Sequence, residues 1–355
     1  MKRKVNNEFF KKNGNLSSKI KQYERLINFK TLKEVETFTL KLKDLDYEKV
    51  DEENDEELID KVVKNHLEFI NYDKLPKSDC PTFNLVIGQP GSGKSSITTN
   101  ENLEETSLII DTDIYRKYHP INKVIDQLNE GEMGLLDKSD YSSITQKFAA
   151  KINDKLREGE IYKNKGALPD LVFETTTPAS WMEEHIFDKY KKLGYKINIS
   201  FISTNPDISN FSQMYRGLET GRLVDYDFHE FSLERIESFF SIIEKYSESD
   251  SNVFNEISLH TRHKKIFTTK NDMNTLKETY LELQKNQDPK DLTWIQDTIV
   301  KLPKLLLDTN ITKELKDQMI KTLNISLKVL GFSSINEEKI PSQSEKQGKS
   351  EFNAP

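Results

Sequence analysis

The residues most able to do chemistry form a short glycine-rich stretch. Gly88–Ser95 reads GQPGSGKS, a glycine followed by four residues and then Gly-Lys-Ser. At this spacing the glycines let backbone N–H groups surround an anion, and a following helix adds its positive N-terminal end. We expect Lys94 to reach the β- and γ-phosphates and the Ser95 hydroxyl to hold Mg²⁺. The stretch therefore predicts binding of a nucleoside triphosphate through Gly88, Gln89, Pro90, Gly91, Ser92, Gly93, Lys94, Ser95 and Ser96.

Two aspartates follow an apolar stretch of strand length, Ser107–Ile110. Phosphoryl transfer needs a positioned acceptor hydroxyl, a metal ion that bridges the phosphates, and cations on the transferred group. We assign Asp113 as the base that accepts the proton of the acceptor hydroxyl. Asp111 is expected to support the metal through water or to cap the next segment. The alternative is that both aspartates are ordinary capping or turn residues.

A further acid and two arginines complete the candidate site. Glu174 follows another apolar segment, and we expect it to bind the substrate together with Thr176 or to hold Mg²⁺ through water. The alternative for Glu174 is a solvated acid at the end of a strand. Arg216 and Arg222 lie in a segment that is expected to form a lid over the γ-phosphate, where cations stabilise the charge of the transition state.

Apolar strand-like segments alternate with helical stretches in the middle of the chain. The predicted strands are Phe83–Ile87, Ser107–Ile110, Leu171–Phe173, Lys196–Ser203, Ile257–Leu259 and Lys265–Thr268. The predicted helices include Tyr141–Arg157, Trp181–Leu193, a polar helix that contains Arg216, and Ser232–Tyr246. This alternation predicts an α/β fold, a three-layer sandwich with a mostly parallel sheet. Ligands of such sheets bind beyond the carboxyl ends of the strands, where the glycine-rich stretch and the acids are expected.

Helical segments flank this predicted core on both sides. Residues 1–80 are expected to form a helical N-terminal domain, and residues 81–270 the α/β domain. Residues 271–335 read as C-terminal helices with breaks at Asp288-Pro289 and at Pro303, and residues 336–355 as a disordered tail. Within the core, the apolar stripe of the helix near residue 235 is expected to bury Phe228, Phe231, Phe239 and Phe240.

Composition narrows the classes of function. The formal net charge of −7 over 355 residues argues against a general nucleic-acid binder, which is usually basic. Cys80 is the single cysteine, so an intrachain disulfide and a thiolate metal cluster are excluded. The sequence contains no stretch of about twenty apolar residues and no signal-peptide pattern, so we expect a cytoplasmic protein without a membrane segment.

Several segments together resemble the zeta toxin family of P-loop kinases. The resemblance covers roughly residues 81–268 and is carried by GQPGSGKS at Gly88–Ser95, IIDTDIYRKYHP at Ile109–Pro120, LVFETTT at Leu171–Thr177, and the arginines at 216 and 222. It implies ATP- or GTP-dependent phosphorylation, with Mg²⁺, of the 3′-hydroxyl of a nucleotide sugar such as UDP-N-acetylglucosamine, a toxin-type activity. It also implies that Lys94 binds phosphate, that Asp113 is the general base, and that Arg216 and Arg222 contact the phosphates.

Other readings stay open on the sequence alone. The acceptor could be a different small molecule, such as a dinucleotide or a nucleoside. The chain could also be a nucleotide-dependent switch or adaptor without phosphotransfer, and a nucleic-acid end kinase is a third reading that the acidic charge disfavours. Related toxins are held by a helical antitoxin, so the expected partners are an antitoxin protein or the N-terminal helices of residues 1–80 acting as an inhibitor in cis.

Overall fold

The computed structural model describes residues 55–100, 103–116, 148–160, 166–220, 226–249, 252–270, 272–308 and 313–335. Most of the predicted N-terminal helical domain, the predicted tail and Arg222 lie outside these ranges. The chain divides into two compact units, one of residues 1–65 and 112–152 and the other of residues 66–111 and 153–355. The second unit contains the sheet and the glycine-rich loop, whereas α8 (Thr112–Arg116) and most of α5 (Asp55–Phe69) belong to the first.

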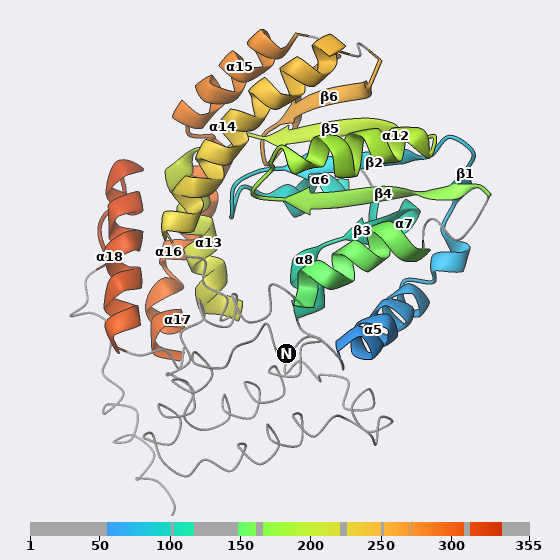
Figure 1. The fold of residues 1–355 in the computed structure, drawn as a ribbon. Helices are drawn as coiled ribbons and strands as arrows, with labels where there is room; N and C mark the ends of the chain where they lie inside the picture. Colours follow the sequence, from blue (N-terminus) through green and yellow to red (C-terminus); the bar gives the residue numbers. More distant parts are fainter. Residues whose placement is uncertain are drawn as a thin grey trace, which may run out of the picture. The chain divides into compact units, whose positions relative to one another are not determined.

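A mixed sheet forms the centre of the second unit (Figure 1). Its strands are β1 (Lys77–Ser78), β2 (Thr82–Ile87), β3 (Ser107–Ile110), β4 (Leu168–Thr175), β5 (Lys196–Ile202), β6 (Phe254–His260) and β7 (Lys265–Thr269). Parallel pairing joins β3 to β4, β4 to β2, β2 to β5, and β5 to β6. The short strands β1 and β7 pair antiparallel with β4 and β6. The predicted α/β fold with a mostly parallel sheet is therefore confirmed.

Helices cover both faces of the sheet because the strands carry apolar residues on both. Phe83, Leu85 and Ile87 of β2 belong to the main core cluster, whereas Val86 belongs to a smaller cluster on the opposite face. The smaller cluster includes Ile97 of α6 (Lys94–Asn100) and is lined by Leu103 of α7 (Leu103–Thr106). The main cluster is closed by the π-helical turn η3 (Glu183–Asp188), α12 (Lys189–Lys192), α14 (Tyr226–Ser249) and α15 (Met273–Lys285).

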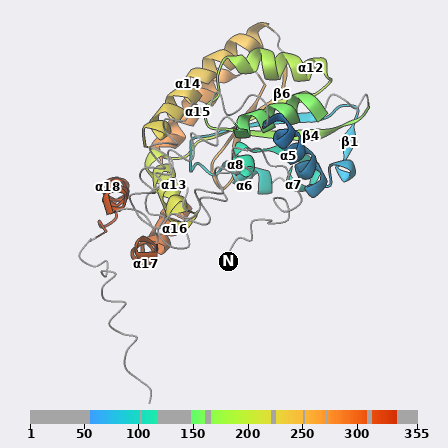
Figure 2. The same ribbon diagram turned by 60° about the horizontal axis from the view of Figure 1, so that its bottom comes forward.

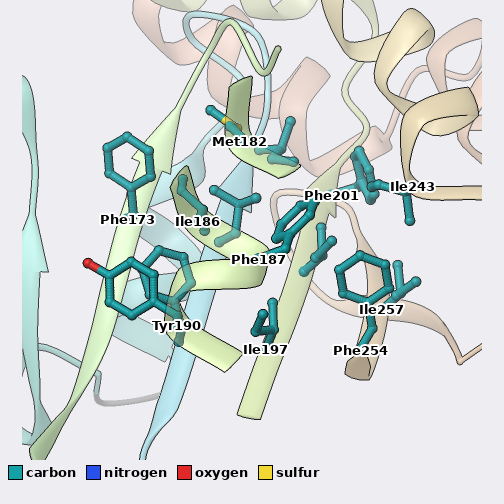
Figure 3. Close-up of a cluster of buried hydrophobic side chains, with 14 of the residues drawn as sticks. Phe173, Met182, Ile186, Phe187, Tyr190, Ile197, Phe201, Ile243, Phe254 and Ile257 are labelled. Carbon is teal, nitrogen blue, oxygen red and sulfur yellow. The ribbon is translucent and has the colours of Figure 1, made fainter. Parts of the chain in front are cut away.

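Aromatic rings fill much of the main core cluster. Figure 3 shows Phe187 and Tyr190, which come from the helical segment before β5, directed toward the strands. The ring of Tyr190 lies 4.3 Å from that of Phe83, and the ring of Phe201 stacks on Phe240 of α14 at 4.4 Å. Large rings of this kind bury much apolar surface, so they hold the helical layer firmly against the strands that carry the loop.

The prediction that four phenylalanines of α14 face the core is partly wrong. Phe239 and Phe240 are buried, but Phe228 and Phe231 are 38% and 41% exposed. Phe228 and Phe239 are eleven residues apart and so lie on the same side of a helix. Phe228 and Phe231 are exposed because they lie in the first two turns of α14, whereas Phe239 and Phe240 lie farther along it. The guanidinium of Arg235 lies over the ring of Phe231, at 4.8 Å.

A second core cluster joins α13 to the C-terminal helices (Figure 2). These helices are α13 (Pro206–Thr220), α16 (Pro289–Ile299), α17 (Leu302–Asp308) and α18 (Lys313–Val329). The predicted break at Asp288-Pro289 is confirmed, because the Asp288 carboxylate caps α16 by accepting from the Lys290 N–H at 2.8 Å. The predicted break at Pro303 is also confirmed, because α16 ends at Ile299 and α17 begins at Leu302, with Pro303 in its first turn, a position that a proline tolerates.

Remaining elements are short. They are the turns η1 (Tyr72–Lys74) and η2 (Leu156–Glu160), and helical residues 148–155 that precede η2. The predicted helix Tyr141–Arg157 is thus described only from residue 148. The predicted helix Trp181–Leu193 is confirmed and ends at Gly194, whose φ of 85° is the left-handed conformation common after helices. Among the described helices, none has the length and apolar character needed to cross a membrane.

Candidate phosphate-binding site

The glycine-rich loop lies where the sequence predicts it, between β2 and α6. The Gly88 N–H donates to the Thr175 carbonyl at 3.3 Å, which continues the pairing of β2 with β4 by one residue. Gly91 and Gly93 have φ values of 75° and 94°, a region that residues with a Cβ rarely adopt. The loop can take this course only because both positions are glycine.

One side of the loop packs directly on the backbone of α13. A Cβ atom at Gly91 would lie 2.1 Å from the carbonyl oxygen of Ser209 and 3.0 Å from the backbone nitrogen of Gln213. The start of α13 is fixed in turn by Asn205, whose side-chain oxygen accepts from the backbone N–H groups of Asp207 and Ile208. The first half of the loop is therefore held by rigid main chain.

Buried polar side chains connect the loop to the segment after β5. Gln89 donates from Nε2 to the Thr204 carbonyl at 2.7 Å, and Thr204 donates from Oγ1 to the Ser92 carbonyl at 2.9 Å. Gln89 Oε1 and Ser92 Oγ are buried and make no hydrogen bond within the described part of the chain. Such unsatisfied groups are costly in a protein interior, so the loop carries hydrogen-bonding capacity that its own fold does not use.

His229 of α14 contacts the start of α13, which supports the loop at Gly91. Its Nε2 atom is 2.8 Å from the hydroxyl oxygen of Ser209, and the histidine is 2% exposed. Burial, followed by the positive charge of Lys94, lowers the pKa of His229 from its usual 6.5 to about 4. The side chain is therefore neutral near pH 7. Sequence reasoning missed His229, since a single histidine on an amphipathic helix carries no local signal.

The Lys94 side chain folds back onto the start of the loop. Its ammonium group donates to the carbonyl oxygens of Gly88 and Gln89, at 2.8 and 3.2 Å. Ser96, in the first turn of α6, donates from Oγ to the Gly93 carbonyl at 2.6 Å and is also 3.2 Å from the Arg262 carbonyl. Ser95 is exposed at the same helix start. The cation and the hydroxyls thus surround one concave turn of backbone.

Two of the predicted acids lie at neighbouring strand ends, Glu174 as the second-last residue of β4 and Asp111 directly after β3. Strand pairing places Ile110 beside Phe173 and Glu174 beside Val86, so Asp111 and Glu174 both lie at the edge where β2 enters the loop. The Thr98 hydroxyl, on α6, donates to Glu174 Oε1 at 2.8 Å. Asp111 and Thr176 are half-buried. Glu174 is thereby tied to the helix that begins with Lys94.

Three further predicted residues are Asp113, Arg216 and Arg222. Asp113 lies in α8, which belongs to the first unit, and its side chain is outside the described part of the chain. Arg216 is exposed on α13, seven residues after Ser209, whereas Arg222 lies in an undescribed segment. The roles of these three residues remain predictions.

The hydrogen-bond donors of the loop suit the phosphate oxygens of a bound triphosphate. Gly91 and Gly93 give the loop a backbone conformation at positive φ, the Lys94 ammonium group lies at its carbonyls, and buried polar atoms of Gln89 and Ser92 have no partner in the described part of the chain. Mg²⁺ prefers oxygen ligands and is commonly bound by substrate phosphates with one or two protein groups. Ser95 and Asp111 are the residues that would hold it. Within the described residues, no three His, Cys, Asp or Glu side chains gather as a separate metal site.

Comparison with solved structures identifies the fold. A structure from the PezAT chromosomal toxin–antitoxin system of Streptococcus pneumoniae is 20% identical with a TM-score of 0.54, covering 70% of this chain and 96% of that chain. The AvrRxo1-ORF1:AvrRxo1-ORF2 complex with sulphate ions is 16% identical with a TM-score of 0.46, covering 79% of this chain and 85% of that chain. At such identities the first comparison establishes a shared fold.

Sequence comparison gives the family. A search among curated proteins finds no match. The profile of the family described as Zeta toxin matches residues 68–272, which is more than half of the 355 residues. This region contains the sheet, the glycine-rich loop and the acids that follow the strands. The chain belongs to the zeta toxin family.

Proposed function

We propose that the protein is a kinase that transfers the γ-phosphoryl group of ATP or GTP to a hydroxyl group of a nucleotide sugar. The observation that carries the proposal is the loop between β2 and α6, with glycines at positive φ and the Lys94 ammonium group over it. Family membership supports phosphotransfer. The preferred acceptor is the 3′-hydroxyl of a UDP-N-acetylglucosamine-like molecule, which rests on the family resemblance.

Each residue has a defined task in this proposal. Backbone N–H groups of the glycine-rich loop and the Lys94 ammonium group bind the phosphates. Bound Mg²⁺ would neutralise charge on the phosphates, with Ser95 and Asp111 nearest to it. Asp113 takes the proton of the acceptor hydroxyl while the hydroxyl oxygen forms a bond to the γ-phosphorus. The bond between the γ-phosphorus and the departing nucleoside diphosphate breaks. Arg216 and Arg222 stabilise the charge that builds up on the transferred group, and Glu174 and Thr176 orient the acceptor.

The experiment incubates the full chain with γ-labelled ATP and a metabolite extract, and identifies the phosphorylated product by mass spectrometry. UDP-N-acetylglucosamine alone is the direct test of the preferred acceptor. Lys94→Ala and Asp113→Ala should each abolish transfer while the circular dichroism of the folded protein is retained. Lys191→Ala is a matched control, because Lys191 is an exposed lysine of α12. Wild-type turnover by folded Asp113→Ala would contradict the base assignment.

The flanking segments suggest regulation of this activity. We propose that residues 1–80 act as an inhibitor in cis or provide the surface for an antitoxin protein. The PezAT structure comes from a toxin–antitoxin system, which supports an antitoxin partner for this chain. Deletion of residues 1–75 should raise phosphotransfer and toxicity if the segment inhibits in cis. Unchanged activity and toxicity after the deletion would contradict inhibition in cis.

A further inference from the structure

The turn between β6 and β7 lies against the second half of the phosphate loop. A Cβ atom at Gly93 would lie 3.2 Å from Cγ and 3.3 Å from Nε of Arg262. The Ser96 hydroxyl lies 3.2 Å from the Arg262 carbonyl oxygen, to which it donates. Arg262 therefore contacts the loop through its side chain at Gly93 and through its backbone at Ser96, on both sides of Lys94.

The guanidinium group of Arg262 is held from the other side by α13 and α16. Its Nη2 atom donates to the Ser212 hydroxyl at 3.2 Å, and Nη1 lies 3.4 Å from the Asp291 carboxylate. The same guanidinium lies over the indole ring of Trp294, at 5.1 Å. Asp291 also lies 3.1 Å from Nε2 of His263, the next residue of the turn. The side chain of Arg262 thus fills the space between the loop and the C-terminal helices.

The energetics of this ion pair favour a role in positioning. The Asp291 side chain is 7% exposed and that of Arg262 is 17% exposed, so both charges are largely removed from water. Burial lowers the pKa of Arg262, and the carboxylate of Asp291 acts in the opposite direction. A buried ion pair adds little stability compared with apolar residues of the same size. What it can do is fix one geometry, and the neighbouring Gly93 has a backbone conformation that its surroundings must hold.

We propose that Arg262 is a positioning residue for the phosphate loop and that Asp291 and Trp294 of α16 hold it in place. Arg262 supports Gly93 and the first turn of α6, so that the backbone N–H groups keep the direction that a triphosphate requires. Asp291 and Trp294 lie beyond residue 272, where the family match ends. The C-terminal helices therefore set the nucleotide affinity of this chain. The inference rests on the proposed nucleotide binding and adds residues to it.

The test measures the dissociation constant of a fluorescent ATP analogue for the full chain, without any acceptor. Arg262→Met keeps the length of the side chain and removes the charge, and it should raise the Kd roughly tenfold. Arg262→Lys and Asp291→Asn should raise the Kd in the same direction and by less. Arg235→Met is the matched control, because Arg235 also lies over an aromatic ring but on the exposed side of α14. The control should keep the wild-type Kd.

A double variant separates positioning from general stability. If Asp291 acts through Arg262, Asp291→Asn should change the Kd no further in the Arg262→Met background. Thermal unfolding without nucleotide gives the temperature range in which each variant is folded, and binding is measured there. Trp294→Phe keeps an aromatic ring under the guanidinium and should have the smallest effect on the Kd. Arg262→Lys and Asp291→Asn serve as the test if Arg262→Met does not fold.

Two outcomes overturn the inference in different ways. If the wild-type chain binds the analogue and folded Arg262→Met has the same Kd, the positioning role alone is contradicted. If Arg262→Met does not fold, a wild-type Kd in both Arg262→Lys and Asp291→Asn has the same meaning. An Asp291→Asn effect that adds in full to that of Arg262→Met has the same meaning. A folded wild-type chain that does not bind the analogue contradicts both the proposed nucleotide binding and this inference.

Discussion

The two halves of the phosphate loop are supported in different ways. At Gly91 the neighbour is the main chain of α13, with the Ser209 carbonyl oxygen 2.1 Å from where a Cβ would be. At Gly93 the neighbour is the Arg262 side chain, with atoms 3.2 Å or more from the corresponding point. A helix backbone cannot give way by the distance that a 2.1 Å contact requires, whereas the Arg262 side chain needs to shift by only a few tenths of an ångström. The first half of the loop is therefore expected to tolerate no change, and the second half to be adjustable.

Gly91→Ala should have the largest effect on nucleotide binding. Its Cβ would collide with the Ser209 carbonyl, and its φ of 75° would be strained in addition. A displacement of catalytic groups by about 1 Å can lower the reaction rate roughly a hundredfold. We expect a rise of the same order in the Kd for an ATP analogue. Titration of the folded variant checks the result. Binding near the wild-type level would show that α13 is not a rigid support.

His229, which contacts Ser209 of α13, makes the stability of the Gly91 half of the loop depend on pH. Its pKa of about 4 in the folded protein lies below the usual 6.5, so the unfolded state binds the proton first as the pH falls. The contribution of His229 to stability is complete above pH 6.5 and is lost between pH 6.5 and about 4.

His229→Gln keeps a polar partner for Ser209 and removes this titration. The slope of unfolding free energy against pH should fall by up to one proton, about 1.4 kcal/mol per pH unit, in that window. Urea unfolding at a series of pH values measures the slope. His185→Gln, at an exposed histidine, is the matched control. An unaltered slope in His229→Gln would mean that His229 is not the buried neutral group described here.

Gly93→Ala tests the adjustable half and should have a smaller effect than Gly91→Ala. The left-handed backbone conformation costs a residue with a Cβ about 1–2 kcal/mol, which corresponds to roughly a tenfold rise in Kd. The Arg262 side chain would have to shift by only a few tenths of an ångström to accept the new methyl group. If the two glycine variants weaken binding equally, the distinction between rigid and adjustable support is wrong.

Thr98→Val should have the smallest effect on nucleotide binding, because it alters neither the contact of α13 with Gly91 nor that of Arg262 with Gly93. The change removes the hydrogen bond to Glu174 and should destabilise the protein by about 1 kcal/mol, without a change in nucleotide Kd. Chemical unfolding and nucleotide titration measure the two quantities. A large loss of affinity would instead place Glu174 in nucleotide binding.

Local patterns in the sequence were sufficient for much of the fold. The strand Ser107–Ile110 has the predicted bounds, and the helix after the loop begins at Lys94 as expected. Each of these features depends on residues a few positions apart. The exposed Phe228 and Phe231 show the limit of this reasoning, since a helix periodicity does not tell which part of an apolar stripe meets the core.

The supports of the loop could not be predicted in this way. Ser96 and Arg262 are 166 residues apart in sequence, and Gln89 and Thr204 are 115 apart. Their contacts arise only when the strand order brings the ends of β2, β5 and β6 together. The turn at Arg262-His263 was visible between two predicted strands, but its partner Asp291 lies on a separate helix.

α13 has a practical consequence for defining the smallest piece of this protein that can fold. Its apolar side chains, among them Phe211 and Met214, are buried against α16, α17 and α18. A fragment cut at the end of the family match would leave that side uncovered, and exposed apolar surface of this kind promotes aggregation. Ile335 is itself anchored, since its N–H donates to the Asn324 side chain at 2.6 Å. A soluble fragment for binding studies should therefore extend at least to residue 335.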